Sequence, residues 1–159
     1  MAATAPAVKG LPAIAASYER TDAFLGNLRD SCEAAGNAGE RDRVAREREL
    51  NDQAWFVLAW GQLETEIDDA CRDAIQSGKS HREWRYRRVW GMFDQDNPRL
   101  SFRNRLSLVL DRNSDLWRRT VELYEVRNQV AHGELRSEGI DVSTVIEDFY
   151  RIHASLVRD

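Results

Sequence analysis

Residues 55–71, WFVLAWGQLETEIDDAC, decide the fold class, because apolar side chains return there every three or four positions. This spacing places them on one face of an α-helix, and such a face needs other elements to cover it. Charged residues of alternating sign precede the stretch, and Ser77-Gly78 follows it as a stop signal. The predicted core face consists of Phe56, Trp60, Leu63, Ile67, Ala70 and Ala74.

Apolar residues at the same helical spacing recur before and after this stretch. An earlier helix closes at the turn 36–39, and its apolar positions are Leu11, Ile14, Tyr18, Leu25, Leu28 and Cys32. Ser101 is a candidate N-cap for a short helix with Phe102, Leu106, Val109 and Leu110 inward. A further helix ends near Gly133 and carries Trp117, Val121, Tyr124 and Asn128 on one line. The last helix has Val142, Val145, Phe149, Ile152 and Leu156 inward, with Thr144 and Glu147 as a capping box.

No segment alternates long enough to predict a strand, so the sequence predicts an all-α protein, an antiparallel bundle of four to five helices. We expect residues 1–10 to be a flexible segment and residues 11–159 to be one domain. The net charge of −4 argues against a general DNA-coating protein. Two cysteines, Cys32 and Cys71, are too few for a disulfide framework and indicate buried thiols in a reducing compartment.

The membrane and secretion signals are weak. No apolar run approaches the roughly 20 residues of a membrane span, and the alanine-rich start is interrupted by Lys9, Gly10 and Pro12. We therefore expect a cytoplasmic protein with no membrane partner.

The candidate chemistry lies in RNQVAHG, residues 127–133. In a helix, Asn128 and His132 stand one above the other, and Arg127 lies about 140° round from His132. An imidazole in the final turn can accept and donate protons, and an arginine can hold a phosphate and stabilise its developing charge. These groups suit phosphoryl transfer without a metal. The spacing alone also fits a structural role, in which Arg127 pairs with a carboxylate, Asn128 caps or bridges helices, and His132 interacts favourably with the negative end of the helix dipole.

RNQVAHGEL resembles the signature of HEPN domains (higher eukaryotes and prokaryotes nucleotide-binding), an arginine, a polar residue, three variable positions and a histidine. Arg127, Asn128 and His132 fill the defined positions. The helix WFVLAWGQLETEI and the segment FRNRLSLVL are similar to the family's earlier core helix and to the short helix before its motif helix, so the resemblance extends over about residues 50–157.

The resemblance implies a four- to five-helix bundle that dimerises, with two motif helices forming one composite site. It implies a metal-independent endoribonuclease, of the kind found among toxins and phage-defence proteins, with RNA as substrate, a homodimeric partner, and an antitoxin or regulatory protein. His132 would be the acid/base for attack of the ribose 2′-hydroxyl on its phosphate, Arg127 would bind that phosphate, and Asn128 would position it. No cofactor is expected.

The resemblance also leaves an alternative. Other members are non-catalytic modules for dimerisation or for binding RNA or protein. One toxin branch has a tyrosine two residues after the histidine, which its antitoxin modifies by nucleotide transfer. Here that position is Glu134, which argues against an antitoxin of that kind.

Residues 79–90, KSHREWRYRRVW, interleave basic and aromatic side chains and are a candidate RNA-contacting surface. Its candidate contacts are Arg82, Arg85, Arg87, Arg88, Trp84 and Tyr86. In the alternative interpretation, Trp84 and Trp90 cover the end of the bundle core, and the arginines are solvated.

Two carboxylates, Glu64 and Asp68, lie one turn apart at the margin of the predicted core face. They would orient Arg127 or His132, or form a structural salt bridge with an arginine. The three histidines and the cysteines share no ligand spacing, so no metal site is expected.

Overall fold

The computed structural model describes residues 10–93, 100–134 and 139–156, and these residues form six helices and no strand. The all-helical class expected from the sequence is confirmed, with one more helix than predicted. The helices are α1 (Leu11–Ala34), α2 (Ala38–Ser80), α3 (Trp84–Trp90), α4 (Phe102–Val109), α5 (Asp115–Ala131) and α6 (Val142–Ser155). The connection before Pro98, the turn at Ser137-Glu138 and the N-terminal segment before Gly10 lie outside the described residues.

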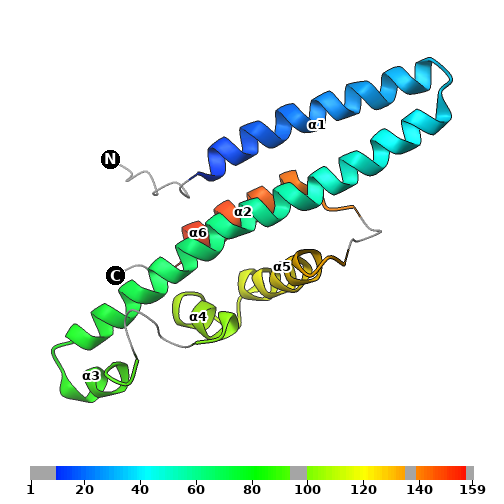
Figure 1. The fold of residues 1–159 in the computed structure, drawn as a ribbon. Helices are drawn as coiled ribbons and strands as arrows, with labels where there is room; N and C mark the ends of the chain where they lie inside the picture. Colours follow the sequence, from blue (N-terminus) through cyan, green and yellow to red (C-terminus); the bar gives the residue numbers. More distant parts are fainter. Residues whose placement is uncertain (1–9, 94–99, 135–138, 157–159) are drawn as a thin grey trace, which may run out of the picture.

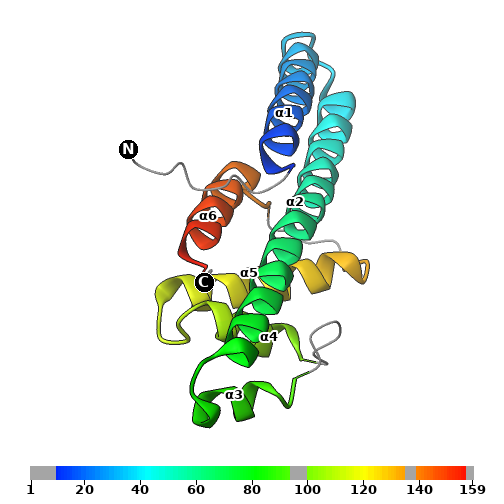
Figure 2. The same cartoon turned by 90° about the vertical axis from the view of Figure 1, so that its left-hand side faces the viewer.

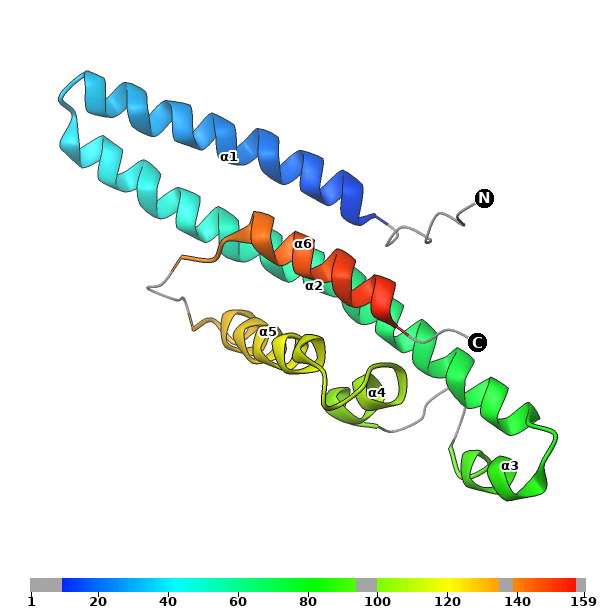
Figure 3. The ribbon, with the colours of Figure 1, turned by 180° about the vertical axis from the view of Figure 1, so that it is seen from behind.

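The 43-residue helix α2 is the element around which the others are arranged. At about 1.5 Å per residue it is roughly 65 Å long. Helix α1 runs back along its first half, α4, α5 and α6 pack along its middle, and α3 lies at its end (Figures 1 and 3). Every described helix therefore touches α2.

Trp60, in the middle of α2, is the centre of the core and is fully buried. Its ring lies 5.4 Å from that of Phe102 on α4, 6.0 Å from Tyr124 on α5 and 5.8 Å from Phe149 on α6. The face predicted from the sequence is buried as expected, apart from Ala74, which is partly buried. Aromatic contacts of this kind stabilise a core beyond the area they bury.

The helix ends agree in part with the prediction. Ser101 caps α4 as expected, its side chain accepting from the Asn104 backbone N–H at 3.4 Å. The predicted start of α6 is wrong, because the cap is Asp141, whose carboxylate accepts from both the backbone and the hydroxyl of Thr144. The predicted end of α2 is also too early, since the helix continues through Gly78 to Ser80.

The outer part of the α1–α2 hairpin extends beyond the other helices as an arm (Figures 1 and 2). The expected burial of Leu25 and Leu28 is wrong, because α2 is the one described helix that runs beside this part of α1. Leu28 is exposed and Leu25 is partly covered. An ion pair between Arg48 Nη2 and Asp22 Oδ2, at 2.7 Å, joins the two helices of the arm.

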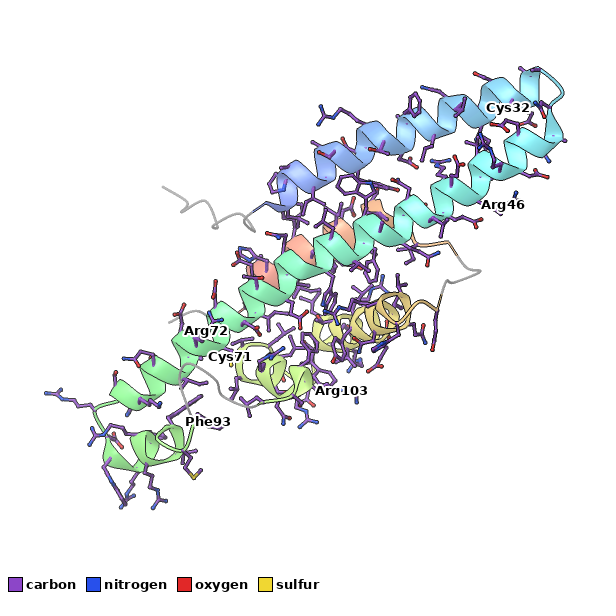
Figure 4. The ribbon with its side chains drawn as sticks, viewed as in Figure 1. Cys32, Arg46, Cys71, Arg72, Phe93 and Arg103 are labelled. Atoms are coloured by element: carbon purple, nitrogen blue, oxygen red, sulfur yellow. The ribbon has the colours of Figure 1, made fainter. Side chains whose placement is uncertain are left out.

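The two cysteines are free thiols on different helices. Cys71 is buried on α2 and Cys32 is partly exposed near the tip of the arm (Figure 4). Burial raises the pKa of the Cys71 thiol, which makes it less reactive. Among the described residues, no helix is both long and apolar enough to cross a bilayer.

Candidate functional site

The end of α5 is built by local hydrogen bonds that the glycine permits. Gly133 has a φ of 84° and donates to the Val130 carbonyl, and Glu134 donates to the Gln129 carbonyl, both at 3.0 Å. This pair of bonds is a Schellman motif, which a residue in the left-handed region allows. His132 is the C-cap residue, one position beyond the helix, rather than a member of its final turn.

Arg127 lies half-buried against α2, with 32% of its side chain exposed. Its Nη2 is 3.2 Å from Glu64 Oε2, and its Nη1 donates to Asn128 Oδ1 at 3.1 Å. Its Nε is buried without a hydrogen-bond partner. These contacts use two of the five guanidinium N–H groups, so the terminal nitrogens keep donors that can take an anion at the exposed edge.

Glu64 joins three helices at this point. One of its oxygens, Oε2, accepts from Trp60 Nε1 at 3.0 Å as well as from Arg127, and the other accepts from Arg105 Nη2 at 3.4 Å. The side chains of α2, α4 and α5 fill the space between these helices (Figure 4). The structure thus places Glu64, one of the two predicted carboxylates, directly against Arg127, in a salt bridge that also holds α4.

Asp68, the other predicted carboxylate, pairs with Arg105. Its Oδ1 lies 2.9 Å from Arg105 Nε, although neither atom makes a hydrogen bond of good geometry. Burial raises the pKa of Asp68, and Arg105 opposes the rise. Arg105 was not predicted as a site residue, yet it is adjacent to Leu106 in sequence and so stands at the edge of the face that α4 turns to the core.

His132 and Arg127 lie in different environments within one chain. The imidazole is at an exposed position at the end of α5, whereas the guanidinium faces α2. Five residues of helix separate them by about 7.5 Å along the axis and about 140° around it. Asn128 lies on the His132 side of the helix, and its side chain accepts a hydrogen bond from Arg127.

The basic-aromatic residues 79–90 comprise the last two residues of α2, the turn that follows and helix α3. All residues from 81 to 89 are exposed, including the candidate contacts Arg82, Trp84, Arg85, Tyr86, Arg87 and Arg88. Trp90 is partly buried and belongs to the edge of the core, as the structural interpretation predicted. The same interpretation is wrong for Trp84, 62% of which is exposed.

Two hollows lie elsewhere on the described surface. One, of about 400 Å³, lies between α1 and α6 and includes Tyr18 and Tyr150 in its lining. The other, of about 230 Å³, lies on the arm beside Arg48 and Asp52. Neither includes a predicted site residue. Within the described ranges, no three His, Cys, Asp or Glu side chains gather closely enough to hold a metal ion.

Comparison with protein-family models, with curated proteins and with solved structures found no match to this chain. The candidate site is therefore defined by its own residues and by the geometry of α2, α4 and α5.

Proposed function

We propose that this protein is a metal-independent endoribonuclease of the HEPN type, acting as a homodimer of helical bundles. The observation that carries the proposal is the end of α5, where Arg127 is held with Asn128 and His132 follows at an exposed helix end. Such enzymes act as toxins or in phage defence, which also implies an antitoxin or regulatory protein as a partner.

Each residue has a definite role in this proposal. His132 accepts the proton of the ribose 2′-hydroxyl as its oxygen attacks the adjacent phosphorus. The bond to the 5′-oxygen of the next nucleotide breaks, that oxygen takes up a proton from a His132 imidazolium of the composite site, and a 2′,3′-cyclic phosphate remains. Arg127 holds the phosphate oxygens through its exposed N–H groups, Asn128 positions the guanidinium, and Glu64 holds it from behind.

The exposure of His132 supports a site completed by a second chain. One chain offers the imidazole to solvent and keeps the guanidinium against α2. Two copies related by a two-fold axis bring the α5 end of one chain to the α5 end of the other, and the four groups can then surround one phosphate.

A second candidate is a non-catalytic helical module that binds RNA or protein. The salt bridge to Glu64 favours it, because that carboxylate already balances the charge of Arg127 and joins it to Trp60 and Arg105. In that case the role of Arg127 is to hold α5 on α2, and no RNA is cut.

The test is cleavage of an end-labelled single-stranded RNA in EDTA, with products examined for a 2′,3′-cyclic phosphate. We expect His132→Ala to lower the rate about 100- to 10,000-fold and Arg127→Ala about 100- to 1,000-fold. Arg118→Ala is the matched control, since Arg118 is an exposed arginine on the same helix, paired locally with Asp115.

Light scattering reports the oligomeric state, and circular dichroism reports folding, for every variant. Cleavage that persists at the wild-type rate in either His132→Ala or Arg127→Ala refutes the catalytic assignment. If folded wild-type protein cuts no RNA, the binding module is the better description. Expression in a bacterial host is a second readout, because a toxin slows growth and His132→Ala should relieve that effect.

A further inference from the structure

In helix α3, Trp90 is partly buried against the core, whereas residues 84–89 are exposed. Trp90 packs on α2 so closely that a Cβ built on Gly78 would lie 2.3 Å from the Trp90 ring. The other aromatic residues of α3 face solvent, with 62% of Trp84 and 59% of Tyr86 exposed. Large exposed rings gathered in one place are typical of a binding surface.

The same segment is strongly basic in an acidic chain. Residues 79–90 hold five basic side chains and a single acidic one, although the net charge of the whole chain is −4. Coulomb attraction over a Debye length depends on this local charge, so the segment attracts polyanions. The basic residues are Lys79, Arg82, Arg85, Arg87 and Arg88, and the acidic residue is Glu83.

Local contacts hold the arginines and rings beside one another. The Arg88 guanidinium lies 5.1 Å from the centre of the Trp84 ring, a cation–π contact. Arg87 Nη1 donates to the His81 carbonyl at 3.0 Å, and the His81 ring meets the Tyr86 ring at 4.9 Å. The arrangement alternates π-faces with positive charge, which matches the alternation of bases and phosphates in an unpaired strand.

We propose that residues 79–90, the α3 platform, bind single-stranded nucleic acid at a docking site of their own. Bases stack on Trp84 and Tyr86, and the arginines contact phosphates. This proposal rests on the proposed function only for the identity of the bound nucleic acid as RNA. Binding to the platform itself uses none of Arg127, Asn128 and His132.

The platform is remote from the candidate cleavage site. Along α2, Ser80 lies about 24 Å from Glu64, the contact of Arg127, at about 1.5 Å per residue. Helix α4 lies between α3 and α5 along this axis (Figures 1 and 3). An RNA strand that contacts both the α3 platform and the candidate cleavage site therefore crosses the middle of the protein. A substitution can remove one of these contacts and leave the other.

The test is the fluorescence anisotropy of a labelled 2′-O-methyl oligouridine of about 15 nucleotides, within the site sizes of single-strand binding proteins. This probe resists cleavage by 2′-hydroxyl attack. We expect Trp84→Ala to weaken binding about 5- to 150-fold, and Trp84→Phe, which keeps a ring, to recover most of it. Phe24→Ala is the matched control, because Phe24 is 66% exposed on α1, and it should bind as the wild type does.

Salt dependence tests the arginines. We expect Arg85→Ala to reduce the slope of log affinity against log salt by about 0.7, the value for one phosphate contact in a single strand, and Arg118→Ala to leave it unchanged.

Equal losses in Trp84→Ala and Phe24→Ala would overturn the proposal. So would heparin, a polyanion without bases, if it bound as tightly as the oligouridine at equal charge. A failure of the nuclease proposal is seen separately, as folded wild-type protein that binds the oligouridine but cuts no RNA.

Discussion

Replacing Glu64 by Gln keeps the shape of the side chain and removes the charge that Arg127 and Arg105 share. Glutamine has one acceptor oxygen and one amino group, so at least one of the three donors around Glu64 would face an N–H. A hydrogen bond to a charged group contributes about 1.5–3 kcal/mol. The side chain is 23% exposed, and screening by water reduces this value.

We therefore expect Glu64→Gln to lower the free energy of unfolding by about 2 kcal/mol, and Tm by about 4–8 °C in a chain of this size. Urea and thermal unfolding followed by circular dichroism measure both quantities. Glu125→Gln is the matched control, because Glu125 pairs with Arg103 at 2.8 Å with 52% of its side chain exposed. A surface pair of this kind contributes about 1 kcal/mol or less.

Equal effects of the two substitutions would refute the reasoning, because they would mean that Glu64 holds nothing beyond an ordinary surface partner. A double-mutant cycle of Glu64→Gln with Arg127→Met isolates the pair itself. We expect a coupling free energy between Glu64 and Arg127 of about 1 kcal/mol or more. A coupling near zero would mean that Glu64 stabilises the fold through Trp60 and Arg105 instead.

Two further predictions concern α2. Gly78→Ala puts a methyl group 2.3 Å from the Trp90 ring, so we expect α3 to be displaced and trypsin to cut faster after the arginines of α3. Gly61→Ala is the control, because nothing lies within 4 Å of its added methyl group, and it should be neutral or stabilising by up to about 1 kcal/mol. Equal rates of digestion for the two variants would contradict the expected displacement of α3. Burial, helped by the charge of Asp22, raises the pKa of Asp52 from 3.8 to about 6, so the neutral form of the carboxyl favours folding. The contribution of Asp52 to the free energy of unfolding is therefore complete below about pH 4 and is lost as the pH rises through about 6. Asp52→Asn should therefore gain on the wild type in free energy of unfolding between about pH 4 and pH 7, by no more than about 1 kcal/mol after solvent screening; urea titrations at both pH values measure the gain, and a difference independent of pH would contradict it.

The features that the sequence predicted correctly are those that depend on neighbours along the chain. The apolar period around Trp60 gives the buried face of α2 because helix geometry alone sets it. The stop at Gly133 and the cap at Ser101 are likewise decided within one turn.

The features that it missed depend on which distant segment covers a face. Leu28 has the same spacing as the buried residues of α1, but no third helix among the described residues reaches it, and it stays exposed. Gly78 is a stop signal by local rules, yet it lies inside α2, where Trp90 packs on the bare backbone. For Glu64, the periodicity placed the carboxylate at a helix margin but could not choose among the chain's many arginines. The pairing with Arg127 follows from the crossing of α5 over α2.

The arm, which consists of the C-terminal part of α1 and the N-terminal part of α2, affects the cooperativity of unfolding. Its helices are adjacent in sequence and meet mainly each other, with Val44 as the fully buried side chain of its outer part. A pair of helices with so thin an interior can fray from its tip while the layer around Trp60 stays intact. The arm is thus a unit of lower local stability, so a molecule that binds the arm and orders it pays that local ordering cost while the layer around Trp60 stays unchanged.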